Sequence, residues 1–113
     1  MGYTAFDLDG TLAIDTPNRN NDTEIGEPVI PMVELAKKLI AEGEDVRIFS
    51  ARAWQPVPDM RKLVYNAINQ WCIQHIGQAL RIMYYKDHDL ERFYDDKAVS
   101  VQKDTGRILR CEV

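Results

Sequence analysis

The chain has 113 residues, of which 45% are hydrophobic and 28% charged, and its formal net charge is −4. This length fits one compact domain, residues 1–113, and leaves no room for a second one. Composition excludes a membrane span, which needs roughly 20 consecutive apolar residues, and the acidic balance disfavours tight binding to long nucleic acids.

The amino-terminal residues have no basic region ahead of an apolar one, so they do not form a signal peptide. Cys72 and Cys111 are far apart and belong to no paired motif, which fits two free thiols in a reducing compartment. We therefore expect a cytoplasmic protein that has no membrane partner.

The first expected strand, residues 3–8, is aromatic and apolar and ends in Asp-Leu-Asp-Gly. A polar stretch, residues 15–27, follows it and contains Pro17, several asparagines and Gly26. Such a composition is typical of an exposed loop or a small hairpin. We predict a short flap over about residues 13–30, and long loops of this kind are often functional.

The next four elements alternate between helix and strand. Apolar residues spaced three and four apart predict helices over residues 31–42 and 59–76, which end at Gly43 and Gly77. Short apolar runs predict strands over 46–49 and 80–85. This alternation is typical of βαβ units.

The last part of the chain is expected to hold a short turn or helical piece, 87–92, and two strands, 98–101 and 108–113. Asp104-Thr105-Gly106 is a turn signal between these strands, which are therefore antiparallel to each other. The fold class that we predict is α/β, a three-layer Rossmann-like sandwich with a mainly parallel sheet, helices on both faces and a minimal or absent cap.

Polar residues follow the strand ends, where parallel sheets carry their reactive groups. They are Asp7 and Asp9 after the first strand, Ser50 after the second, Lys86 after the third, and Asp95 and Asp96 after the fourth. Up to four carboxylates in one pocket require protons or a bound cation. Oxygen ligands beside a phosphate favour Mg²⁺. An EF-hand is excluded, because positions 5, 6 and 12 counted from Asp7 are Thr11, Leu12 and Asn18.

This arrangement resembles the haloacid dehalogenase (HAD) superfamily of phosphotransferases, and within it the small capless hydrolases of bacteria and phages. Asp7-Leu8-Asp9-Gly10-Thr11-Leu12 is similar to the first motif of that family, and Ser50 to the second. Lys86 fits the third motif and Phe93-Tyr94-Asp95-Asp96 the fourth. The four places occur in the order of the family and span nearly the whole chain.

The resemblance implies a magnesium-dependent phosphatase that hydrolyses a phosphomonoester through an aspartyl-phosphate. Asp7 would be the nucleophile, Asp9 the general acid and base, and Ser50 and Lys86 would contact the phosphoryl group or offset its charge. The implied metal ligands are Asp7, Asp9, Asp95 and Asp96. The implied substrate contacts are Gly10, Thr11, Ala51 and Arg52.

Several alternatives stay open. Arg52 either contacts substrate phosphate or forms a surface ion pair, Lys97 competes with Lys86 as the active-site lysine, and Trp54 either stacks on a base or sugar or packs within its loop. Without a cap, the substrate itself or a second subunit of a homo-oligomer has to cover the site, unless specificity is low. The expected partner is a phosphorylated small molecule, a nucleotide or a nucleic-acid end. The alternative functions are a phosphotransferase and a non-catalytic phosphate-binding regulatory module.

Overall fold

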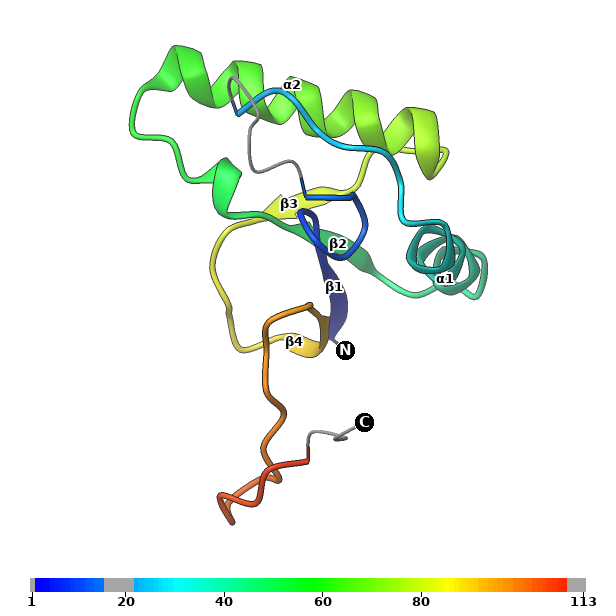
Figure 1. Cartoon of the computed structure of the whole chain (residues 1–113), viewed down its shortest axis with the longest axis vertical. Coiled ribbons are helices and arrows are strands. Elements are labelled where there is room, and N and C mark those ends of the chain that lie inside the picture. The colour runs from blue at the N-terminus through cyan, green and yellow to red at the C-terminus, as the bar shows by residue number, and fades with distance from the viewer. Residues whose placement is uncertain (1, 16–21, 110–113) are drawn as a thin grey trace.

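The computed structural model describes residues 2–15 and 22–109 and shows a four-stranded sheet with two helices (Figure 1). The strands are β1 (Tyr3–Asp7), β2 (Val46–Phe49), β3 (Arg81–Met83) and β4 (Leu90–Tyr94). The helices are α1 (Ile30–Ala41) and α2 (Pro58–His75), and a 3-10 turn, η1 (Ala51–Ala53), follows β2. The strand order is β3-β2-β1-β4 and every pairing is parallel, so the α/β, Rossmann-like class is confirmed.

The helices form where the apolar spacing predicts them, within one residue at each end. In α2, Val64, Ile68, Trp71 and Cys72 recur at helical spacing and are buried. Proline near the start of each helix suits the first turn, where a backbone N–H has no partner in the helix. Gly77 ends α2 with φ +110, and its N–H bonds the carbonyl of Cys72 at 2.9 Å.

Both helices pack on the same face of the sheet, so the prediction of helices on both faces is wrong. The larger core joins Phe6 and Ile48 of the sheet to Val33 of α1 and to Val64 and Ile68 of α2. Right-handed crossovers that step in one direction, from β1 to β2 to β3, place their helices on one side. Only the return from β3 to β4 reverses direction, and residues 84–89 of that return form a loop rather than a helix.

The opposite face has a small core of its own, made of Tyr3, Ala5 and Met83 with Phe49 and Phe93 packed beside them. The loop between β3 and β4 runs from the carboxyl end of the sheet to its amino end. It begins after Met83, and the carbonyl of its Asp89 accepts from the N–H of Tyr3, at the start of β1, at 3.0 Å. This face has no helical layer among the described residues.

The carboxyl-terminal third differs most from expectation. The third strand is three residues long, and the turn expected over 87–92 is limited to residues 88 and 89, because β4 begins at Leu90. Of the expected antiparallel pair, the residues up to 109 show one bridge, Val101 to Ile108, around a turn in which Asp104 has φ +63. Residues 110–113, with Cys111, and residues 16–21 of the flap lie outside the described part of the chain.

The flap returns to the domain at residues 22–28, where Ala13 bridges to Pro28 and the N–H of Val29 bonds the carbonyl of Leu12 at 2.7 Å. Its described part therefore runs beside the turn that follows β1. Neither described helix has the length and apolar character that crossing a membrane requires.

Candidate active site

Three of the predicted metal ligands converge at the carboxyl end of the sheet. Asp7 ends β1, and Asp95 and Asp96 directly follow β4, which pairs with β1 in parallel. One carboxylate oxygen of each residue lies within 4.8 Å of the others. Their backbone segments are far apart in sequence, and the parallel register of β1 and β4 brings them together. We call Asp7, Asp95 and Asp96 the acidic cluster.

The acidic cluster has an unfavourable balance of charge. The pKa of Asp7 is raised to about 8, mainly by burial and then by hydrogen bonds with Asp95 and Asp96 and by their negative charge. A carboxyl group in such surroundings holds a proton unless a cation joins it. Proximity, burial and an all-oxygen donor set together match a hard divalent ion such as Mg²⁺.

The position of the Asp96 carboxylate depends on the turn that follows Asp9. Gly10 has φ +90, and a Cβ at this position would lie 2.7 Å from Oδ2 of Asp96. Thr11, which is buried, donates its hydroxyl to Oδ1 of Asp96 at 3.4 Å. Gly10 and Thr11 thus support a carboxylate of the cluster, which is a different role from the substrate contact expected of them.

Asp9 is neutralised by the chain itself. Nε and Nη2 of Arg52 donate to its two carboxylate oxygens at 2.7 and 2.6 Å. The Arg52 side chain is 2% exposed, and its Nη1 also donates to the backbone carbonyls of Asp22 and Glu24 at 2.8 and 2.7 Å. Of the two interpretations of Arg52, the structure shows the ion pair, but this pair is buried and anchors the flap.

Ser50 lies beside this pair and is buried. It follows β2, its N–H bonds the carbonyl of Met83 at 2.9 Å, and its Oγ accepts from the N–H of Arg52 at 3.2 Å. The hydroxyl therefore caps η1, the turn that contains Arg52. Ala51 and Trp54 are exposed at the same turn, Trp54 by 63%.

Neither candidate lysine contacts the acidic cluster through its amine in the part of the chain that the structure describes. Lys86 is exposed in the loop between β3 and β4. Lys97 is exposed as well, and its contact with Asp95 is made by its backbone N–H, 3.3 Å from Oδ2. The fold therefore brings together the acidic residues, Ser50 and Arg52, but it does not bring either lysine's amine to them.

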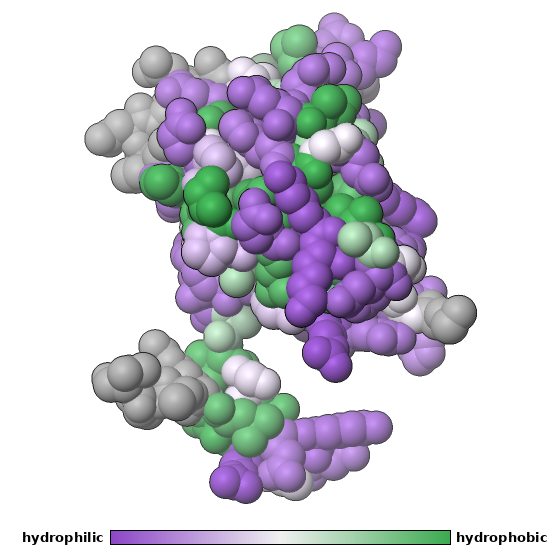
Figure 2. Space-filling view, turned by 90° about the vertical axis from the view of Figure 1, so that its right-hand side faces the viewer, coloured by the Kyte–Doolittle hydropathy of each residue, from purple (hydrophilic) through white to green (hydrophobic). Residues whose placement is uncertain are grey.

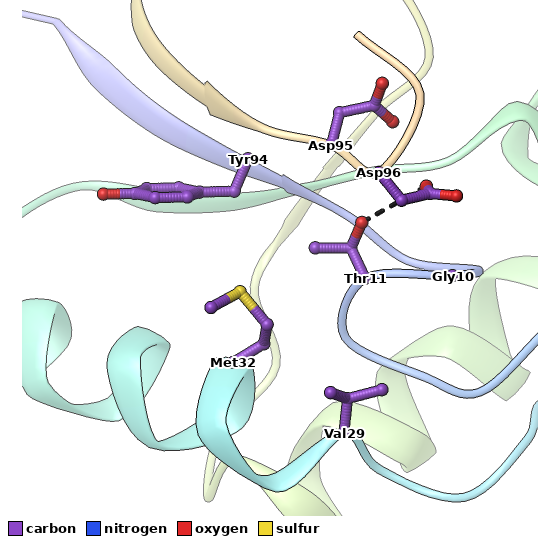
Figure 3. Close-up of a pocket in the computed structure, with 7 residues that line it drawn as sticks. All are labelled: Gly10, Thr11, Val29, Met32, Tyr94, Asp95 and Asp96. Carbon is purple, nitrogen blue, oxygen red and sulfur yellow. Dashed lines mark hydrogen bonds between the residues drawn. The ribbon is translucent and has the colours of Figure 1, made fainter. Parts of the chain in front are cut away.

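A pocket of about 280 Å³ opens beside the cluster (Figure 3). Asp95 and Asp96 line one side with Gly10 and Thr11, while apolar atoms of Val29, Met32 and Tyr94 line the other. Figure 3 shows Met32 reaching from α1 toward β4, below the Tyr94 ring. These three residues were not predicted as site residues. Their only signal was position, since Val29 and Met32 follow the flap and Tyr94 belongs to the fourth motif.

Comparisons with known protein families, with curated proteins and with solved structures give no match. What the chain shows by itself is a small α/β domain with a four-stranded parallel sheet and a group of three carboxylates able to hold a metal ion.

Proposed function

We propose that this protein is a magnesium-dependent phosphohydrolase of the HAD type, in which the carboxylate of Asp7 attacks a phosphomonoester. The observation that carries the proposal is the convergence of Asp7 with Asp95 and Asp96 at the carboxyl end of a parallel sheet. The order of the Asp7, Ser50 and Asp95-Asp96 motifs along the strands supports the same assignment.

The acidic cluster fits a divalent ion. Asp7, Asp95 and Asp96 would hold it through carboxylate oxygens, and Asp9 would contribute its backbone carbonyl. When bound, Mg²⁺ would offset charge on the phosphoryl oxygens and favour the ionised form of Asp7. The raised pKa of Asp7 supports this fit, because burial and the neighbouring carboxylates disfavour its ionised form, which a bound cation would stabilise.

The chain's own groups then divide the chemistry into two steps. The Asp7 carboxylate forms a bond to phosphorus while the ester oxygen leaves and takes a proton from Asp9. In the second step Asp9 takes a proton from water, whose oxygen attacks the phosphorus of the aspartyl-phosphate. Phosphate leaves, and the free Asp7 carboxylate is restored.

Arg52 adds a requirement to these steps. Both carboxylate oxygens of Asp9 accept from Arg52, an arrangement that suits an ionised group. Asp9 must therefore turn at least one oxygen away from the guanidinium and take up a proton from solvent before it can protonate a leaving group. A dianionic phosphate beside Arg52 would compete for the same donors and so favour this turn.

The open surroundings of the site suit more than one substrate. A short loop joins β3 to β4, and Trp54 is exposed beside the turn that holds Arg52. A phosphorylated small molecule, a nucleotide or a nucleic-acid end is the proposed substrate. Phosphotransfer to an acceptor other than water would use the same residues, and acceptor competition during phosphate release separates the two reactions.

The test is p-nitrophenyl phosphate turnover with and without Mg²⁺ in wild type and Asp7→Asn. We expect the substitution to lower kcat by about a thousandfold or more, because an amide is not a nucleophile here. Asp104→Asn is a matched control, since Asp104 is exposed in the carboxyl-terminal turn and asparagine accepts its φ of +63.

Turnover that does not change in Asp7→Asn removes Asp7 from the mechanism. A wild type that binds inorganic phosphate with Mg²⁺ in calorimetry but turns over no phosphomonoester of a metabolite and oligonucleotide panel would identify the regulatory module instead.

A further inference from the structure

The segment after the fourth strand projects away from the domain (Figure 1). Residues 100–109 form a hairpin around the Val101–Ile108 bridge, which we call the C-terminal hairpin. Each hydrogen bond described for it joins two of its own residues, as from the N–H of Leu109 to the carbonyl of Ser100 at 2.8 Å. The Cα radius of gyration is 14.6 Å, whereas a compact chain of this length has about 13 Å.

The C-terminal hairpin and the residue before it expose large aliphatic side chains. Their exposed fractions are 46% for Val99, 54% for Val101, 65% for Ile108 and 50% for Leu109. Figure 2 shows these apolar residues gathered on the projection below the main body. An isolated two-stranded hairpin is marginal in water, and apolar residues beside unpaired strand edges favour association. The hairpin therefore has the character of a docking element.

The distribution of charge identifies the surface that complements the C-terminal hairpin. Residues 97–113 contain four basic and two acidic side chains, a net +2, whereas residues 1–96 contain ten basic and sixteen acidic ones, a net −6. Two such hairpins repel each other, and a hairpin is attracted to the body of the same protein. This complementarity favours contact between the C-terminal hairpin of one copy and the body of another.

The body offers an acidic pocket of about 300 Å³, lined by Gly2, Gly43, Glu44, Asp45 and Glu91. It lies at the amino-terminal ends of the strands, and Figure 1 labels the N-terminus beside β4, the strand below which the hairpin projects. Glu91 belongs to β4, whose described pairing is with β1, so the outer edge of β4 has no strand partner among the described residues. Asp45 already pairs with Arg47 at 2.8 Å, which leaves Glu44 and Glu91 as the main acceptors for incoming cations.

We propose that this protein forms a two-fold homodimer in which each C-terminal hairpin docks on the partner's β4 edge and acidic pocket. Val101 and Ile108 are covered there, and Lys103 and Arg107 face Glu44 and Glu91 of the other copy. Donor and acceptor surfaces lie at the same end of the molecule, so one two-fold axis makes both contacts at once. The dimer does not depend on the proposed phosphatase activity.

The test is sedimentation equilibrium of the full chain over a range of concentrations. We expect a dimeric wild type and a monomeric Val101→Asp/Ile108→Asp variant whose circular dichroism and thermal unfolding match those of wild type. Leu63→Asp is the control, because Leu63 on α2 has the same 54% exposure as Val101, and it is expected to stay dimeric. A monomeric wild type, or a dimer that persists in the double variant, overturns the proposal.

A second pair of variants separates docking from misfolding. Lys103→Glu/Arg107→Glu should weaken dimerisation by at least about tenfold, because four rim ion pairs are lost, two at each docked hairpin. Combining it with Glu44→Lys/Glu91→Lys should restore the dimer, because the charges are then exchanged. Failure of the exchange to restore it overturns docking at this pocket.

Discussion

Asp7 and Asp9 are two residues apart in one motif, yet their surroundings differ in how charge is balanced. Asp9 has a buried guanidinium that donates to both of its oxygens. Asp7 faces two further carboxylates, and its pKa rises to about 8. The charge of Asp9 is neutralised within the chain, whereas the charge of Asp7 is removed by a proton or, as proposed above, balanced by a bound ion. Two aspartates of one motif thus differ in their partners: Asp9 has a cation of the chain itself, and Asp7 has two carboxylates that could hold a metal ion with it.

Replacing Arg52, the cation that pairs with Asp9, should have the largest effect on stability. Arg52→Met leaves Asp9 without its partner and the carbonyls of Asp22 and Glu24 without this donor. We expect a loss of about 3 kcal/mol in the free energy of unfolding, measured by urea denaturation. Arg52→Lys, which keeps the charge but not the bidentate contact, should lose less. A variant as stable as wild type would mean that the pair contributes nothing.

Protonation of Asp7 in the acidic cluster should have the next largest effect, because it makes both stability and Mg²⁺ affinity depend on pH. Because the pKa of Asp7 rises from 3.8 to about 8, the folded protein keeps a proton that the unfolded chain releases. The stability of the metal-free protein therefore falls as the pH rises from about 4 to about 8, which is opposite in sign to a carboxylate in an ion pair.

Binding of Mg²⁺ displaces that proton, so its affinity should rise by up to about tenfold per pH unit below pH 8 and then level off. Calorimetry in two buffers of different ionisation enthalpy measures the proton released. Asp7→Asn lacks the titrating ligand and should lose the slope. An affinity that is independent of pH in wild type would contradict the raised pKa.

A substitution in the turn that supports Asp96 should have an effect of intermediate size. Gly10→Ala places a methyl group 2.7 Å from Oδ2 of Asp96 at a φ of +90, so the carboxylate or the turn must move. We expect about 1–2 kcal/mol of destabilisation in thermal unfolding and weaker Mg²⁺ binding. Gly106→Ala is the control, because it has a similar φ of +77 but open space around it, and it should lower stability without changing Mg²⁺ affinity.

The sequence was sufficient for those features that depend on local pattern. Helical spacing predicted α1 and α2, and the strand-end aspartates predicted the acidic cluster, since parallel strands end at one edge. The side of the sheet that each helix covers depends on strand order, which no local pattern contains, and so the second helical layer was wrongly expected. The ion pair of Arg52 with Asp9 could not be predicted either, because it depends on how the side chains of η1 lie against the turn after β1.

Relieving the repulsion in the acidic cluster should give the smallest effect and the most direct one. Asp95→Asn removes one negative charge and keeps the shape of the side chain. In the absence of Mg²⁺ at pH 8 we therefore expect the variant to be more stable than wild type, by about 0.5–1 kcal/mol, as measured by thermal unfolding. With saturating Mg²⁺ the order should reverse, because wild type has the additional anionic ligand and gains binding free energy.

Asp59→Asn is a suitable control, since Asp59 lies in the first turn of α2 and the variant should lose a little stability with or without the ion. If Asp95→Asn destabilises the metal-free protein, the three carboxylates are held by contacts among themselves, and the difference between Asp7 and Asp9 does not lie in charge.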